Sequence, residues 1–376
     1  MTATKPEVLW EPDVDQLDAL PPGTVIQLDH MNDDFPDKRP RAAKVTRHQW
    51  DFRDGRATSP MIIRACTFKG IEILERGEWV TEPGIHLDMD EDRYHGDPVE
   101  AGSLSVSRLK TLIQPGGPAR FAWDRTHPRG DRPEFDFGHA AHALVLGAGA
   151  PLHRLSYDDM RSKAAKEEAS TARAKGAVPL KPKEYDQVVE MAAAIESTPG
   201  AQAALAGEPE VSAFRQDDES GLWLRARFDV LGDHHLGDYK TAVSADPDTF
   251  ARKAYEFGYD MQAAHYLATA VALGAVPADA PFRFVVQEKT APYLVSVIEL
   301  DQSYLEIGTE RVRRAIDLYA ACVAAGDWPG YPADVVTVGP PRWATSPLTS
   351  DGATALDPDL EQQMLALMTD QKETPR

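Results

Sequence analysis

Three stretches of the chain alternate between apolar and polar residues, which is typical of strands whose two faces meet different surroundings. They cover residues 210–216, 222–231 and 234–241. In the second stretch the residues of one face are apolar: Leu224, Ala226, Phe228 and Val230. The opposite face carries Arg225, Arg227 and Asp229. Gly232-Asp233 lies between the second and third stretches and predicts a hairpin turn.

Before and after these strands in sequence, apolar residues recur with the spacing of a helix. It predicts a helix that Ser105 or Ser107 would cap and that would end before Pro115. The other predicted helices cover 137–146, 184–206, 248–273 and 303–325, and further strands cover 282–287 and 293–300. Strands with helices before and after them predict an α/β fold, with a mixed central sheet flanked by helices.

The first part of the chain has a different pattern. Runs such as Thr24–Leu28 and Met61–Cys66 favour strands, and Gly and Pro punctuate them. We therefore expect a small N-terminal β-rich module over residues 1–82. A linker over 83–100, a main domain over 101–345 and a tail over 346–376 complete the expected organisation.

Composition limits the class of protein. The chain has 376 residues, of which 42% are hydrophobic and 27% charged, as in ordinary soluble proteins. No run of 18 apolar residues and no basic-then-apolar start is present, so we expect neither a membrane span nor a secretory signal. Cys66 and Cys322 are the two cysteines and lie far apart, which fits a reducing cytoplasm.

The predicted hairpin gathers charge. If its strands pair in register, Asp229 and Asp238 converge on one polar face, and Lys240 lies on the same face as Asp238. Two partly desolvated carboxylates repel each other unless a cation lies between them. A divalent cation such as Mg²⁺, which prefers oxygen ligands, is the usual partner. A structural ion pair between Asp238 and Lys240 is the alternative.

Several motifs in order resemble the PD-(D/E)-x-K nucleases, and within them the phage recombination exonucleases of the exodeoxyribonuclease VIII and lambda exonuclease type. The first is Asp229 followed by Asp238-Tyr239-Lys240. The others are Gly138-x-x-x-His142, Gln262-x-x-x-Tyr266, Tyr94–Pro98 with Leu104–Ser107, and Gln287–Tyr293. Together they extend over residues 92–345. The resemblance implies a restriction-endonuclease-like core in the main domain.

The resemblance also implies roles for residues. The expected metal ligands are His142, Glu210, Asp229, Asp238 and the backbone carbonyl of Tyr239, holding two Mg²⁺ ions for which Mn²⁺ can substitute. Lys240 would orient the attacking water, and Gln262 and Tyr266 would complete a catalytic set with Asp229, Asp238 and Lys240. Glu208 competes with Glu210 for its role, and His139 is the less favoured alternative to His142.

Charge complicates a DNA-binding role, because the formal net charge is −20 and duplex affinity comes largely from Lys and Arg. The segment 161–183 is the exception, with seven basic residues against two acids. We expect DNA contacts from Arg161, Lys163, Lys175, Lys181, Lys183 and Arg227. There are three alternatives. In the first, the basic residues of the segment are solvated helix faces; in the second, Arg227 only balances charge; in the third, the basic residues of 120–132 are the DNA site.

The function implied by the resemblance is a metal-dependent exodeoxyribonuclease. It would resect double-stranded DNA ends from 5′ to 3′ and leave 3′ overhangs for a single-strand annealing recombinase. A ring-shaped homo-oligomer, a trimer or tetramer, would turn the basic segment inward. Relatives with an iron–sulfur cluster need four thiolates, so two cysteines exclude that branch. The alternatives are a single-strand or flap nuclease of the same core and a DNA-binding protein with a decayed active site.

Overall fold

The computed structural model describes residues 7–10, 14–29, 41–46, 49–52, 70–75, 77–127 and 136–340. The chain divides into two units, Met1–Gly330 and Tyr331–Arg376. In the second unit the described residues, 331–340, form no helix or strand. None of the described helices is both long and apolar enough to cross a membrane.

The N-terminal residues form a small antiparallel sheet. Its strands are β1 (Glu7–Trp10), β2 (Val25–Asp29), β3 (Arg41–Thr46), β4 (Gln49–Phe52) and β5 (Gly70–Glu75), in the order β1-β5-β2-β3-β4. The short helix α1 (Val14–Asp18) lies between β1 and β2 in sequence. The predicted strand at Thr24–Leu28 is confirmed as β2, whereas Met61–Cys66 lies outside the described residues.

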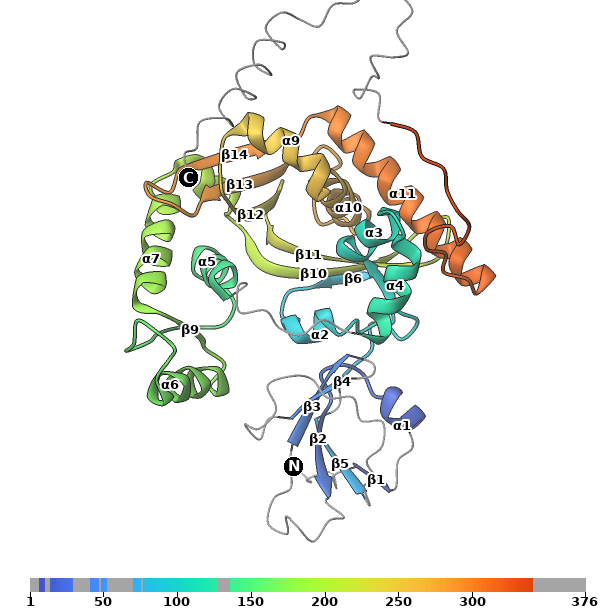
Figure 1. The fold of residues 1–376 in the computed structure, drawn as a ribbon, viewed down its shortest axis with the longest axis horizontal. Coiled ribbons are helices and arrows are strands. Elements are labelled where there is room, and N and C mark those ends of the chain that lie inside the picture. The colour runs from blue at the N-terminus through green and yellow to red at the C-terminus, as the bar shows by residue number, and fades with distance from the viewer. Residues whose placement is uncertain are drawn as a thin grey trace, which may run out of the picture. The chain divides into compact units, whose positions relative to one another are not determined.

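A seven-stranded mixed sheet forms the centre of the main domain (Figure 1). The order is β14-β13-β12-β11-β10-β6, and β7 pairs in parallel with one end of β11. Only the β7–β11 and β12–β13 pairs are parallel in this sheet. The strands are β6 (Gly84–His86), β7 (Ser103–Ser105), β10 (Glu208–Gln216), β11 (Trp223–Leu231), β12 (Leu236–Ala242), β13 (Phe282–Glu288) and β14 (Val295–Glu299).

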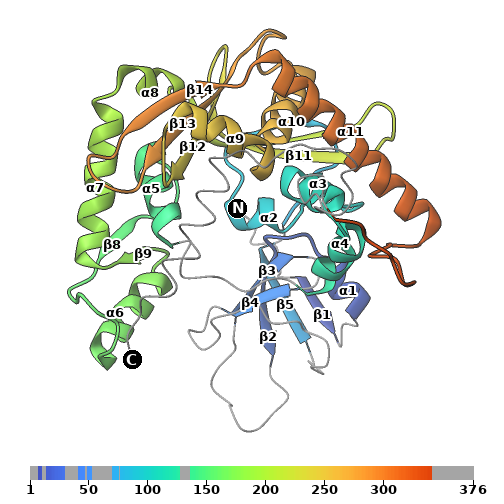
Figure 2. The same ribbon diagram turned by 45° about the horizontal axis from the view of Figure 1, so that its top comes forward.

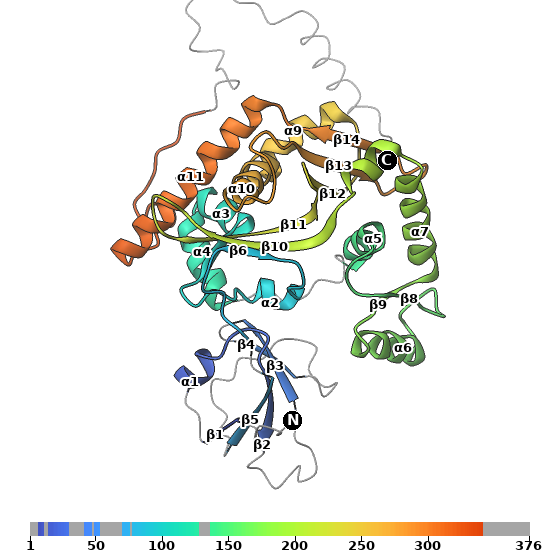
Figure 3. The same ribbon diagram turned by 180° about the vertical axis from the view of Figure 1, so that it is seen from behind.

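Helices cover both faces of this sheet, which confirms the predicted α/β class (Figures 1 and 3). One face packs its largest apolar cluster against α3 (Val106–Ile113), α4 (Gly117–Thr126), α9 (Pro247–Phe257), α10 (Tyr259–Ala272) and α11 (Gln302–Ala325). The other face of β12 and β13 packs against α5 (Asp136–Leu146), α7 (Pro182–Glu196) and α8 (Pro199–Ala204). The helix α6 (Lys163–Ala174) lies between the paired strands β8 (Leu152–Arg154) and β9 (Val178–Leu180) in sequence (Figure 2).

Two long helices of the sequence prediction are each divided in the structure. The predicted helix 184–206 is α7 and α8, because Thr198 turns the chain and Pro199 starts the second helix. The predicted helix 248–273 is α9 and α10, because Gly258 adopts the left-handed conformation with φ +67° between them. For the helix α3, the structure identifies Ser105 as the cap, since its hydroxyl accepts a hydrogen bond from the Arg108 backbone.

Residues 83–100, which we expected to be a linker, are part of the packed domain. The strand β6 pairs with β10 at the edge of the central sheet. The helix α2 (Glu91–His95) follows it, and Met89, Tyr94 and Val99 are buried against Phe214 of β10. The charged residues of this segment suggested a solvated linker, whereas its few apolar residues cover the sheet.

The strand β11 has two different neighbours along one edge. It pairs with β7 at residues 223–225 and with β12 at Val230 and Leu231. Among the described strands, none pairs with this edge of β11 over residues 226–229. Beyond the hairpin turn, β12 leaves β11 and pairs in parallel with β13 over its whole length. The candidate site lies where the two strands diverge.

Candidate functional site

Asp229 and Asp238 lie directly beyond the hairpin's last pair, Val230 with Gly237, on the side away from the turn. Because the ladder stops there, the backbone N–H of Tyr239 donates to Asp229 Oδ2 at 2.9 Å instead of to a strand. The two carboxylates therefore lie at the point of divergence. The sequence predicted that they would converge through pairing along the hairpin, whereas the hairpin pairs over two residues. Burial raises the pKa of Asp238 to about 6, and the charge of Asp229 adds to this effect.

Asp238, Lys240 and Gln262 form one contact group. Lys240 Nζ lies 2.5 Å from Asp238 Oδ2, and Gln262 Nε2 donates to Asp238 Oδ1 at 2.5 Å. The Asp238 side chain is 1% exposed, so its short contact with the Lys240 ammonium group is a buried, charge-assisted one. Burial opposes the charge of Lys240, but Asp238 and Asp229 outweigh it and raise the pKa of this lysine.

Glu210 and Asp229 are brought together by the pairing of β10 with β11. The pairs on either side, Pro209 with Val230 and Val211 with Phe228, leave these two acids opposite each other. Glu210 has φ +56°, in the left-handed region that non-glycine residues seldom adopt. Such conformations are held by their surroundings and cluster at functional sites. Glu208 is exposed at the start of β10, so the contacts favour Glu210 over Glu208.

His142 of α5 bridges these two carboxylates. Its Nδ1 lies 3.1 Å from Glu210 Oε1 and its Nε2 lies 2.9 Å from Asp229 Oδ2. Both ring nitrogens must donate in this arrangement, which requires the protonated ring. Burial alone would lower the pKa of His142, but Asp229 and Glu210 outweigh it and raise that pKa to about 10. In this structure His142 is therefore a cation between two acids.

Other predicted residues have different surroundings. Arg227 donates from Nε to Glu210 Oε2 at 2.6 Å and from one terminal nitrogen to Met89 O and Ser212 Oγ, which is the charge-balancing alternative. Tyr266 is 7% exposed, packs on Phe228, and is hydrogen-bonded to the backbone of Arg227. Tyr266 is thus as buried as Gln262 and lies near Asp238 and Asp229, and its predicted place near DNA stays a prediction. The side chain of His139 is outside the described part of the chain.

The predicted DNA-binding residues of segment 161–183 lie on α6 and at the ends of its neighbours. Arg161, Lys163, Lys175 and Lys183 are exposed, while Ala165, Ala169 and Ala172 of α6 face inward. Lys163 pairs with Glu167 at 3.5 Å. Lys181 is half-buried and pairs with Glu184 at 2.9 Å at the start of α7. Lys181 therefore has a local structural role that the sequence did not reveal.

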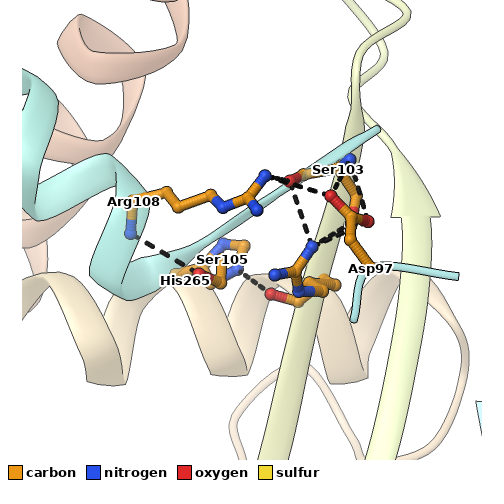
Figure 4. Close-up of polar contacts among 6 residues, drawn as sticks. Asp97, Ser103, Ser105, Arg108 and His265 are labelled. Carbon is orange, nitrogen blue, oxygen red and sulfur yellow. Dashed lines mark hydrogen bonds and ion pairs between the residues drawn. The ribbon is translucent and has the colours of Figure 1, made fainter. Parts of the chain in front are cut away.

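A second polar group, unpredicted from the sequence, joins β7 and α3 to β11 (Figure 4). Asp97 Oδ1 lies 2.7 Å from a terminal nitrogen of Arg225, and Asp97 Oδ2 lies 3.0 Å from Arg108. Ser103 donates to Asp97 through both its backbone N–H and its hydroxyl. Burial opposes the charge of Asp97, but Arg225 and Arg108 outweigh it and lower the pKa of this carboxyl. The sequence signal for this group was the pair of motifs at 94–98 and 104–107, but the motifs do not indicate that Asp97 pairs with Arg225.

His265 of α10 supports the open edge of β11 beside this group. Its Nε2 donates to the backbone carbonyl of Arg225 at 3.0 Å (Figure 4). His265 is 1% exposed, and its Nδ1 is buried without a hydrogen-bond partner. Burial lowers the pKa of His265 to about 4, so the ring is neutral at neutral pH. His265 thus binds a backbone carbonyl of β11 at the end of its pairing with β7.

The oxygen donors of the site have the chemistry that Mg²⁺ requires. Asp229, Asp238 and Glu210 supply carboxylates, and the Asp238 side chain is almost fully buried. Within the described residues, however, no group of three or more His, Cys, Asp or Glu side chains is already arranged as a metal site. His142 and Lys240 occupy the positions between the acids. The donors fit a divalent cation if these basic groups give way.

Comparison with known proteins gives one family match. The model of a family described as a PDDEXK-like domain of unknown function matches residues 105–336. A solved structure from Eubacterium rectale, of a protein provisionally named an exonuclease, is 14% identical, with a TM-score of 0.46. The similarity covers 70% of this chain and 99% of that one. No curated protein matches.

The buried His265 predicts how stability depends on pH. The unfolded chain binds a proton at this histidine below its ordinary pKa of 6.5, whereas the folded chain stays neutral until about pH 4. Stability is therefore fully present above pH 6.5 and falls as the pH drops toward 4. Urea unfolding of the parent and of His265→Gln, between pH 7 and 4.5, should show a shallower pH dependence for the variant.

Carboxylates also titrate in this range, so the comparison between the two proteins is the measurement. His95→Gln, which changes an exposed histidine, should keep the dependence of the parent. The same pH dependence in the parent and in His265→Gln would contradict the assignment.

Proposed function

Since this chain belongs to the family of PDDEXK-like domains of unknown function, we propose that it is a metal-dependent nuclease that hydrolyses phosphodiester bonds in DNA. The contact group of Asp238, Lys240 and Gln262 carries the proposal. Asp238 and Lys240 alternate along β12, and Gln262 contacts Asp238 from α10. Asp229, Glu210 and His142 lie beside this group. A buried acid, a half-buried acid and a half-buried lysine packed together are costly for stability, and their presence in one place supports a catalytic use.

Divalent cations belong to this proposal as cofactors. Asp229, Asp238, Glu210 and the backbone carbonyl of Tyr239 would hold Mg²⁺, with two ions in the site and Mn²⁺ as a substitute. Bound in this way, such ions polarise the phosphate and lower the pKa of bound water. His142 can join the ligands after losing a proton, because metals bind the neutral ring.

The remaining chemistry is assigned to the chain's own residues. The ammonium group of Lys240 orients the attacking water and stabilises negative charge on the phosphate. The Asp238 carboxylate, whose pKa is raised by burial, accepts a proton from that water. Gln262 holds the other oxygen of Asp238 and so fixes the direction of Oδ2.

The proposed substrate is the end of double-stranded DNA, cut from 5′ to 3′ to leave a 3′ overhang. Support comes from the resemblance of the ordered motifs to recombination exonucleases and from the exposed basic residues of α6. A single-strand annealing recombinase would use the product, and the proposed compartment is the cytoplasm. Single-strand or flap cleavage by the same residues is distinguished by the choice of substrate below.

Cleavage should require Mg²⁺ or Mn²⁺ and stop in EDTA. Asp238→Asn keeps a partner for Gln262 but removes the charge, so it should abolish cleavage while the protein stays folded. Lys240→Gln should lower turnover by about 10²-fold or more, the loss expected for an electrostatic group. Blunt duplexes, flaps and single strands, each labelled at either the 5′ or the 3′ end, give the rates and the polarity.

Asp233→Asn is the matched control, because Asp233 is exposed in the turn of the same hairpin. It should cleave like the parent. Full activity of Asp238→Asn or Lys240→Gln would remove that residue from the mechanism. Absence of cleavage by the parent on every substrate, with DNA binding kept, would favour a decayed active site.

DNA is proposed to lie along the basic segment. Lys175 and Lys183 are exposed and have no role in starting α7, unlike Lys181. Replacing both by Ala should lower the slope of log K against log salt by up to ~1.8, because each phosphate contact contributes ~0.9. Binding to a duplex in Ca²⁺, which blocks cleavage, is the measurement. The control is the double variant Arg252→Ala, Arg314→Ala, which removes the same amount of charge from another surface and should keep the slope of the parent.

An unchanged slope in the lysine variant would contradict the assignment and favour residues 120–132 as the DNA site.

A homo-oligomer is proposed to reconcile the net charge of −20 with DNA binding. A trimeric or tetrameric ring with α6 turned inward would present basic residues to threaded DNA and acids to the outside. Light scattering should then give three or four times the mass of one chain. A monomer both with and without DNA would rule out the ring and the processive cutting that it would permit.

A further inference from the structure

Lys110 is a second lysine near the candidate active site. It lies in the last turn of α3, and its Nζ is 5.7 Å from the centre of the Tyr259 ring. Lys240 Nζ is also 5.7 Å from the centre of that ring. The two ammonium nitrogens are therefore at most about 11 Å apart. This upper bound leaves room for the two lysines to contact neighbouring phosphates of one strand, which advance ~3.4 Å each along the axis of a DNA helix.

Gly258 leaves space for the Lys110 side chain. A Cβ atom at this position would lie 2.8 Å from Lys110 Cε and 3.0 Å from Cδ. Gly258 also divides α9 from α10 in the left-handed conformation. The same glycine that ends α9 thus lets the stem of Lys110 reach the Tyr259 ring.

The acids around Lys110 are already paired. Asp238 contacts Lys240 and Gln262, and Asp260 pairs with Arg311 at 2.7 Å. Within the described residues, Lys110 itself forms no hydrogen bond or ion pair, although it is half-buried. Burial lowers the pKa of Lys110 to about 8, and the charge of Lys240 adds to this effect. The site therefore contains one positive charge more than its local acids balance.

We infer that Lys110 binds a phosphate of the DNA strand being cut, next to the phosphate that Lys240 contacts. This inference rests on the proposed nuclease function. An anion between or beside the two ammonium groups would relieve their repulsion, and a phosphodiester supplies that charge. If Lys110 served only in packing, its charge would not be needed, because the contact with Gly258 is made by the carbon atoms of its side chain.

Lys110→Met separates charge from packing, since methionine keeps an unbranched apolar stem of similar length. This variant should keep the melting temperature of the parent and lose about 10²-fold in kcat/KM for duplex cleavage in Mg²⁺. In Ca²⁺ its slope of log K against log salt should fall by ~0.9, the value for one lost phosphate contact. Lys110→Arg, which restores the positive charge, should recover most of both.

Lys253→Ala is the matched control. Lys253 lies on α9 with its Nζ 5.5 Å from the Phe257 ring, but it is exposed and paired with Glu256. It should keep the parent's kcat/KM and salt slope. A parent-like salt slope in Lys110→Met, with or without a loss of activity, would overturn the inference. If the parent does not cleave DNA, the proposed function fails, whereas the salt slope still tests the phosphate contact.

Discussion

The separation of β12 from β11 is the constraint on which the rest of the site depends. If β12 paired with β11 along its whole length, the backbone N–H and C=O groups on this edge of β11 would all have partners. Side chains would then have no backbone groups to bind there. Because pairing stops after Val230 and Leu231, other groups must take the free donors and acceptors. Asp229 accepts from Tyr239, and His265 donates to Arg225. The end of the β11–β12 pairing therefore leaves backbone groups open, and acidic and basic side chains lie next to them.

Much of this arrangement could be predicted because it is local. Alternation along residues 222–231 gives the two faces of β11 directly, and the spacing of Asp238 and Lys240 puts them on one face of β12. These two predictions need only the repeat of a strand. His142 and Gln262 were expected near the acids from the resemblance of their motifs to a nuclease family, not from periodicity. The structure brings His142 to Asp229 and Gln262 to Asp238.

The errors arise where the outcome depends on distant residues. The structure also packs Tyr266 on Phe228, which lies far from it in sequence, and no pattern of the sequence indicated that contact. Residues 83–100 contain few apolar side chains, yet Tyr94 is buried because Phe214 lies opposite. The pairing of Asp97 with Arg225 joins residues of distant parts of the chain, with a positive φ at Asp97. No periodic pattern in the sequence encodes such pairs.

The bridge formed by His142 has a consequence for how these acids are held together. Two carboxylates that face each other repel unless a positive charge lies between them. Here the chain supplies that charge itself, between Glu210 and Asp229. The folded chain can therefore keep the two acids side by side with its own charges alone.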